Sequence, residues 1–108
     1  MRNKNKTANM ATIYHITTKD WWQKWAEFDY YESPTLEEET FIHLSIAEQV
    51  SGVLERYYKG QVNLLKLHVD SDKLAAELKY EQATNDEYFP HLFGRLNKSA
   101  ILEIEEIN

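Results

Sequence analysis

The stretch Phe41-Ile42-His43-Leu44-Ser45-Ile46-Ala47-Glu48 joins two kinds of secondary structure and decides how the rest of the chain is interpreted. Residues 40–44 are mostly apolar around one histidine, which is typical of a short buried strand. Ser45, followed three residues later by Glu48, matches the Ser-x-x-Glu capping box that opens helices. We therefore predict a strand over 40–44 that runs directly into a helix, and Gly60 is expected to end that helix.

Alternating and helical patterns extend the prediction along the chain. Thr18 or Asp20 is expected to cap another helix, in which Trp21, Trp25 and Phe28 share one face and pack on the core. Four further segments alternate apolar and polar residues, as strands with one buried face do. These predicted strands cover 11–17, 65–70, 78–83 and 100–107.

The remaining segments are predicted as connections. Residues 29–39 and 84–87 are polar, and Pro90-His91 is interpreted as a turn. A short helical turn over 71–77 would be capped by Ser71 or Asp72. The resulting order is strand, helix, strand, helix, strand, turn, strand, loop and strand. It predicts an α+β fold with a mainly antiparallel sheet and two main helices.

Length and composition limit the class of protein. The chain of 108 residues is expected to form one domain over 11–108, preceded by a disordered or extended segment over 1–10. Without cysteine it has no disulfide and no thiolate chemistry. No apolar run approaches the ~20 residues of a membrane-spanning helix. The polar start lacks the apolar centre of a signal peptide, so we expect a cytoplasmic protein without a membrane partner.

Charge and glycine content argue against polyphosphate and nucleic-acid partners. The net charge is −6, and the first nine residues hold three basic side chains and no acidic one. The remaining body therefore has 9 basic and 18 acidic residues, a net charge of −9. Such a body repels nucleic acids. With three glycines in all, the chain has no Gly-rich phosphate-binding loop. Because nucleic acids are disfavoured by the charge, we expect a small-molecule ligand as the partner of this protein.

Three histidines lie in apolar segments and are the candidate site residues. His15 follows a strand core and is backed by the hydroxyl of Thr17. In an extended chain His43 and Ser45 point to the same side, near the predicted helix N-terminus. His91 follows Pro90 in the predicted rigid turn. A polar pocket and a set of structural histidines bonded to backbone carbonyls are both compatible with these positions.

Carboxylates give a second set of candidates. Glu81 either forms a surface salt bridge or faces a histidine across the sheet, where it would stabilise a cationic sugar centre. The run Glu37–Glu39 is interpreted as solvated, and His68 as facing solvent on the polar side of its strand. The histidines lack His-x-x-x-His spacing, and no metal site is predicted.

Several of these segments resemble the small bacterial proteins grouped as domain-of-unknown-function family 952. The similarity runs from about residue 12 to 107 and is most specific in the Phe-Ile-His and Phe-Pro-His pieces. The matching segments include 13–17, 31–36, 41–45, 48–50, 80–81 and 89–96.

That family resembles the ADP-ribosyltransferase fold, a split antiparallel sheet that binds NAD in its cleft. The resemblance implies that His15, Thr17 and Ser45 bind NAD as a cofactor. It also implies that His43, Glu81 and His91 carry catalysis of an ADP-ribosyl or phosphoryl transfer. The alternative is a non-catalytic module that binds a small ligand or a protein through its tyrosines. Those tyrosines are Tyr30, Tyr31, Tyr57, Tyr58 and Tyr88.

Overall fold

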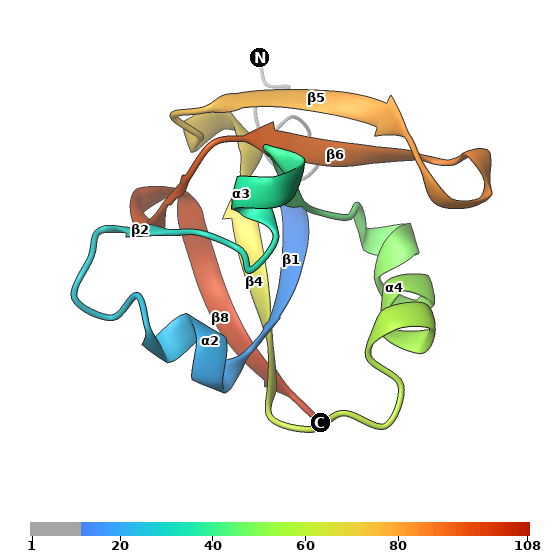
Figure 1. The fold of residues 1–108 in the computed structure, drawn as a ribbon, viewed down its shortest axis with the longest axis horizontal. Helices are drawn as coiled ribbons and strands as arrows, with labels where there is room; N and C mark the ends of the chain where they lie inside the picture. The colour runs from blue at the N-terminus through green and yellow to red at the C-terminus, as the bar shows by residue number, and fades with distance from the viewer. Residues whose placement is uncertain (1–11) are drawn as a thin grey trace, which may run out of the picture.

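Three small antiparallel sheets form the framework of the protein, for which a computed structural model describes residues 12–108. Figure 1 shows one sheet running through the body, a long hairpin crossing one end of it, and short helices on either side. The segment 1–10, expected to be disordered or extended, lies outside the described residues. The α+β class with mainly antiparallel pairing is confirmed.

The central sheet has the order β1-β4-β8. It pairs β1 (Thr12–Thr18) with β4 (Leu64–Asp70), which in turn pairs with β8 (Ile101–Ile107). The predicted alternation in β4 is confirmed, because Leu65, Leu67 and Val69 are buried while Lys66, His68 and Asp70 are partly exposed. The buried side chains of this sheet form the core with Tyr31, Ile42, Leu44, Leu92 and Leu96.

The second sheet joins β3 (Ile42–His43), β6 (Tyr88–Phe93) and β5 (Glu77–Gln82), with β6 in the middle. The predicted turn at Pro90-His91 is wrong, because β6 runs straight through both residues. The backbone N–H of Leu44 donates to the Pro90 carbonyl at 3.0 Å, but proline has no N–H to return the bond. The short strand β3 ends at His43, just where that return bond is missing.

The predicted N-terminal helix is present but shorter than expected. Helix α2 (Lys19–Gln23) begins with Thr18 as its cap, one of the two predicted, and the Thr18 hydroxyl accepts from the Trp21 N–H at 3.1 Å. Beyond Gln23 the chain continues in i to i+3 turns, so Trp25 and Phe28 are not helical. Their rings still contact each other, with centroids 5.7 Å apart.

The predicted helix start at Ser45 is wrong. Ser45 forms a two-way backbone bridge with Tyr14 of β1, each N–H donating to the other's carbonyl at 2.8 Å. This bridge holds Ser45 extended, and the helical turns begin later, as η1 (Ala47–Gln49) and α4 (Val50–Tyr57). The Gln49 side chain, in place of that of Glu48, accepts from the Ile46 N–H at 3.0 Å. Helix α4 ends three residues before Gly60, whose φ is +80°.

Several short elements occur where connections were predicted. Strand β2 (Tyr30–Tyr31) pairs with β7 (Leu96–Asn97), and α3 (Leu36–Glu39) is a single helical turn. The remaining turns are η2 (Ser71–Lys73), η3 (Thr84–Asp86) and η4 (Lys98–Ala100). The carboxylate of Asp70 caps η2, in place of Ser71 or Asp72.

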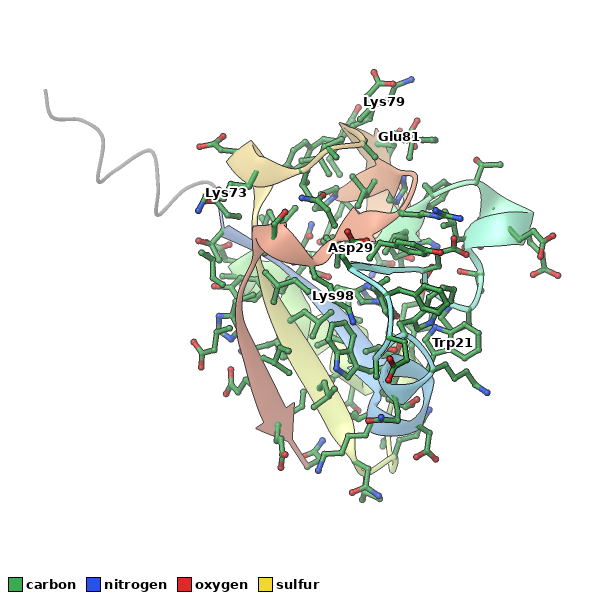
Figure 2. The ribbon with its side chains drawn as sticks, turned by 90° about the vertical axis from the view of Figure 1, so that its left-hand side faces the viewer. Trp21, Asp29, Lys73, Lys79, Glu81 and Lys98 are labelled. Carbon is green, nitrogen blue, oxygen red and sulfur yellow. The ribbon has the colours of Figure 1, made fainter. Side chains whose placement is uncertain are left out.

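Two tryptophans, one in α2 and one just after it, contact Lys98 of η4. Its ammonium group donates to the Trp25 carbonyl at 2.6 Å and lies 4.9 Å from the centroid of the Trp22 ring. Figure 2 shows Lys98 near Asp29, whose carbonyl accepts from the Lys98 backbone N–H at 2.9 Å. Among the described residues, no helix is long and apolar enough to cross a membrane.

Candidate functional site

A cavity of about 490 Å³ lies between β1, helix α4, the loop before α3 and the turn that joins β5 to β6. Four of the predicted site residues line it, namely His15, Thr17, His43 and Ser45. The other lining side chains are mainly hydroxyl-bearing or aromatic, and Glu39 is the only carboxylate among the described lining residues. No described lysine or arginine lines this cavity.

His15 is a buried residue of the cavity wall. It is 6% exposed, and both ring nitrogens have partners. Nδ1 donates to the His43 carbonyl at 2.7 Å, while Nε2 lies 2.9 Å from the Tyr31 hydroxyl. Burial lowers the pKa of His15 to about 4, so the ring is neutral at pH 7. A histidine of β1 is thereby fixed to the backbone of β3.

Tyr31 links that histidine to a second predicted residue. Its hydroxyl is 3.0 Å from the Thr17 hydroxyl, and the phenolic proton therefore has two acceptors within reach, His15 Nε2 and Thr17 Oγ1. Tyr31 is fully buried, and burial raises its pKa. His15, Thr17 and Tyr31 form one buried polar network, which we call the His15 network.

His43 is presented to solvent on the cavity wall. Its Nε2 is 2.7 Å from a carboxylate oxygen of Glu39, and the two side chains are 54% and 43% exposed. This hydrogen bond lowers the pKa of Glu39. Because a carboxylate only accepts, Nε2 carries the proton, and Nδ1 makes no hydrogen bond with another described residue. The geometry is that of an imidazole oriented by a carboxylate.

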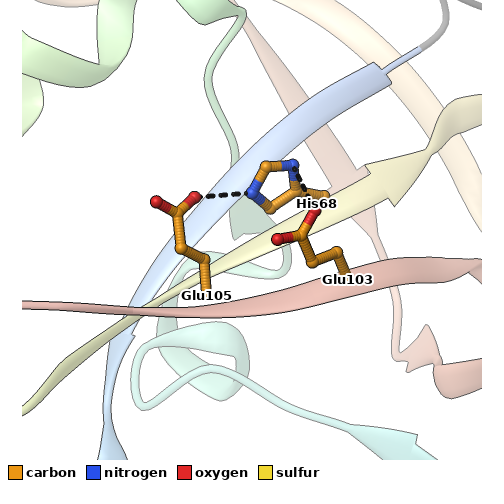
Figure 3. Close-up of side chains that lie close together, drawn as sticks. All are labelled: His68, Glu103 and Glu105. Atoms are coloured by element: carbon orange, nitrogen blue, oxygen red, sulfur yellow. Dashed lines mark hydrogen bonds and ion pairs between the residues drawn. The ribbon is translucent and has the colours of Figure 1, made fainter.

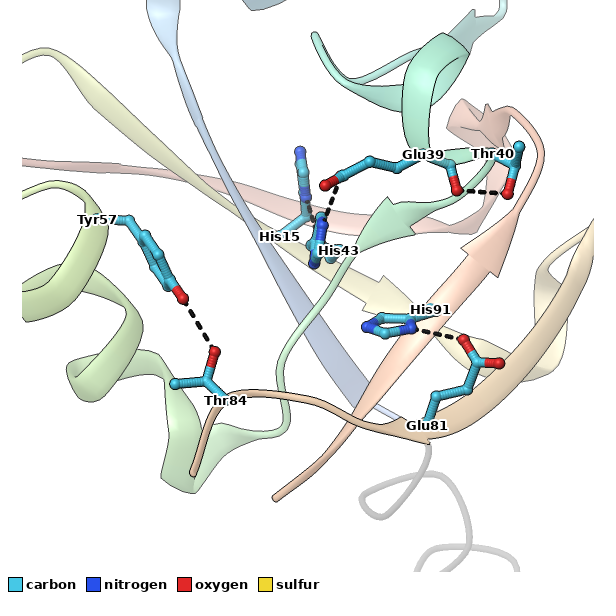
Figure 4. A network of polar contacts seen from close by, with 8 residues as sticks. All are labelled: His15, Glu39, Thr40, His43, Tyr57, Glu81, Thr84 and His91. Carbon is cyan, nitrogen blue, oxygen red and sulfur yellow. Dashed lines mark hydrogen bonds and ion pairs between the residues drawn. The ribbon is translucent and has the colours of Figure 1, made fainter. Parts of the chain in front are cut away.

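His91 and Glu81 form a similar pair beside the cavity without lining it. His91 Nδ1 donates to Glu81 at 2.8 Å, and the His91 side chain is 5% exposed. The rings of His43 and His91 are in contact, with centroids 5.2 Å apart. Figure 4 shows both pairs, with Glu39 above His43 and Glu81 beside His91.

The structure therefore brings the three histidines of the apolar segments together in two different ways. His15 reaches His43 through a backbone carbonyl, and His43 reaches His91 through ring contact. Of these three histidines, only His43 has a side chain that is both exposed and on the cavity wall.

Sequence reasoning missed Glu39, which it placed in a solvated acidic run. The signal was the four-residue spacing between Glu39 and His43, which is the spacing of ion pairs on a helix. Here the single turn of α3 ends at Thr40, whose φ of 69° reverses the chain and returns it to β3.

Tyr57, which also lines the cavity, shares a hydrogen bond of 2.9 Å with Thr84 across the edge of the cavity.

The described residues contain one group of three histidine or carboxylate side chains whose ligand atoms lie within 4.8 Å of each other, namely His68, Glu103 and Glu105. Figure 3 shows that the two carboxylates approach opposite nitrogens of the ring. Nε2 is 2.8 Å from Glu105 and Nδ1 is 3.9 Å from Glu103. The group is a cluster of polar side chains on the outer face of the central sheet, in which His68 is hydrogen-bonded to Glu105 and is only partly exposed.

Together, the fold and the site define a small α+β protein with mainly antiparallel sheets and a histidine-bearing cavity beside them. Residues 16–104 match the family model described as "Protein of unknown function (DUF952)", so the chain belongs to that family.

Solved structures of protein CC0527 from Caulobacter crescentus share this fold. One crystal structure is 30% identical to this chain, with a TM-score of 0.83, and the match covers 90% of this chain and 86% of that one. The solution NMR structure is also 30% identical, with a TM-score of 0.78, and covers 92% of this chain and 86% of that one. No curated protein matches the sequence.

Proposed function

We propose that the cavity binds a small organic molecule that joins a flat ring to a sugar, with the nicotinamide-ribose half of NAD as the first candidate. The observation that carries this proposal is the lining itself. Hydroxyl groups from Thr17, Thr18, Ser33, Thr35 and Ser45 surround it together with tyrosine rings and the Glu39–His43 pair. Hydroxyl side chains suit the hydroxyls of a sugar, and aromatic rings suit a flat base.

Charge selects the part of NAD that fits. The lining has one carboxylate, Glu39, and no described lysine or arginine. Tyrosine faces attract cations, and a carboxylate does so more strongly. The nicotinamide ring of oxidised NAD is cationic, whereas its pyrophosphate is anionic and would meet repulsion. We therefore place the nicotinamide ribose inside the cavity and the phosphates outside it.

The chemistry that follows is transfer of the ribosyl group. Bound there, NAD would supply a sugar whose bond to nicotinamide breaks as a bond to an acceptor oxygen forms. The acceptor proton would go to Nδ1 of His43, and Glu39 would stabilise the imidazolium. Thr17 and Ser45 would bind sugar hydroxyls. Both nitrogens of His15 already have partners, so its part would be to position the backbone of His43.

Binding without turnover is the alternative. It is favoured by His15, which the resemblance implies as a direct ribose contact but which has no free nitrogen. Tyr57 and Tyr58 line the cavity and would bind an aromatic ligand whether or not a reaction follows.

Calorimetric titration tests the proposal directly. Nicotinamide riboside, NAD and ADP-ribose are titrated into the wild-type protein and into the His43→Ala and Glu39→Gln variants. We expect the riboside to bind more tightly than ADP-ribose, and each variant to weaken it at least about tenfold, since hydrogen bonds to charged groups contribute about 1.5–3 kcal/mol. Release of nicotinamide from NAD then separates transfer from binding alone.

His68→Ala is the matched control, because His68 also pairs with a glutamate but does not line the cavity. This variant should bind the riboside like the wild type. Tighter binding of ADP-ribose than of the riboside, or no heat with any of the three compounds, would rule out the proposal.

A further inference from the structure

A polar atom without a partner lies next to the proposed site. Nε2 of His91 is buried and has no hydrogen-bond partner, although the same ring donates from Nδ1 to Glu81 at 2.8 Å. The residue is 4% exposed. Because the carboxylate only accepts, a neutral His91 keeps its proton on Nδ1 and leaves the lone pair on Nε2 unused. Leaving a buried acceptor unpaired costs free energy, so its presence calls for an explanation.

The sheet register puts this atom on the same face as the cavity. Side chains alternate along β6, so Phe89, His91 and Phe93 share one face, and Phe89 lines the cavity. His91 lies directly opposite His43 of β3, and their rings touch. In the view of Figure 4, Nδ1 of His91 turns toward Glu81, while Nε2 turns toward the side on which His43 lies.

One side chain covers the ring of His91. Phe41 stacks on the His91 ring, with the ring centroids 4.0 Å apart and the planes at 17°. The rings of Phe41 and His43 meet edge-on, with their centroids 4.8 Å apart. Phe41 is itself only half-buried, and it precedes a strand of two residues. Because Phe41 lies outside β3, rotation about its side-chain bonds breaks none of the β3–β6 pairing and exposes the stacked face of the imidazole.

We propose that His91, oriented by Glu81, is a second ligand-binding imidazole of the site, which Phe41 covers in the free protein. When Phe41 turns aside, Nε2 accepts a hydrogen bond from a hydroxyl or N–H group of the ligand that His43 contacts. The ligand is then held between two imidazoles, each oriented by its own carboxylate. This inference rests on the proposed function, and it adds that the ligand carries a hydrogen-bond donor on the side of β6.

Chemical modification tests the cover. Diethyl pyrocarbonate acylates accessible neutral imidazole nitrogens, and mass spectrometry locates the modified histidines. In the wild type we expect His43 to react and His91 to react much more slowly. Phe41→Ala should accelerate the reaction of His91 by about tenfold or more. Phe41→Leu keeps an apolar side chain at this position and is included in case Phe41→Ala does not fold. It should accelerate the reaction of His91 less than Phe41→Ala does.

Phe93→Leu is the matched control. Phe93 lies on the same face and contacts Phe41, with centroids 5.4 Å apart, but it does not stack on His91. It should leave the rate at His91 unchanged. Equal rates at His91 in the wild type and in both folded Phe41 variants would overturn the inference.

Nitrogen NMR of the histidine rings separates this inference from the proposed function. Nicotinamide riboside is the probe, and the Nε2 resonance of His91 should move on its addition, whereas Glu81→Ala, which removes the acceptor of the Nδ1 proton, should abolish that movement. If the riboside binds and shifts only His43, the inference fails and the proposed function stands. If the riboside does not bind, both fail together.

Discussion

Replacing Tyr31 with phenylalanine isolates the contribution of the His15 network. The ring stays, so no cavity forms, but His15 Nε2 and the Thr17 hydroxyl each lose a partner at 2.9 and 3.0 Å. All three residues are at most 6% exposed, so the two atoms that lose the phenol hydroxyl lie in a buried environment. A buried group left unpaired costs about 1–3 kcal/mol, so two such groups predict a loss of about 2 kcal/mol or more.

Urea unfolding followed by tryptophan fluorescence measures this loss. A loss of about 2 kcal/mol corresponds to a fall in melting temperature of about 8–10 °C for a domain of this size. Tyr57→Phe is the control, because it removes an exposed hydroxyl that bonds to Thr84. It should change stability by no more than about 0.5 kcal/mol. Equal stability of the two variants would refute the structural role of the network.

Three further predictions concern stability. The pKa of His15 is about 4 in the folded protein and 6.5 ordinarily, so between these pH values the unfolded chain binds more protons than the folded one. The free energy of unfolding should therefore fall by up to about 3 kcal/mol as the pH drops from 6.5 to 4. In a series of urea midpoints measured over this pH range, His15→Gln should remove most of that fall. Gly94 has a φ of +148°, and a Cβ added there would lie 2.9 Å from the Cβ of Ala76. Gly94→Ala should therefore lower the free energy of unfolding, measured by calorimetry, by about 1–3 kcal/mol. Gly52 lies within α4, and the three atoms nearest to an added Cβ there belong to the end of the long Arg56 side chain, which can move aside. Gly52→Ala should therefore stabilise the protein by up to about 1 kcal/mol, and a loss would contradict the helical assignment.

Local patterns predicted the longer elements of this fold. The alternation of Leu65, Leu67 and Val69 was sufficient for β4, because the sheet has one buried and one partly exposed face. The hydroxyl of Thr18 was sufficient for the start of α2, because capping involves only the neighbouring turn.

The errors came from contacts between distant segments. The bridge between Ser45 and Tyr14 overrides the local capping signal, since two backbone hydrogen bonds hold Ser45 extended. Pro90 reads locally as a turn, but its strand is paired on the other side with β5. Strand β2 has only two residues, too few for alternation to appear.

The candidate site could be predicted by residue type more than by partner. His15 and His43 were recognisable because imidazoles are rare in apolar segments. Their partners were not, because Tyr31 and the His43 carbonyl are brought to His15 by sheet pairing. Glu39 was not recognised as a partner of His43, because its two acidic neighbours made it part of a run that is typical of a solvated surface.

The most direct test of the account is a two-dimensional NMR titration of the isotope-labelled protein with nicotinamide riboside. We predict saturable shifts at Tyr14, His43, Tyr57 and Phe89, residues that line the cavity from four different elements. We also predict that Glu39→Gln largely removes these shifts. Shifts confined to residues outside the cavity, or shifts that Glu39→Gln leaves unchanged, would contradict the account.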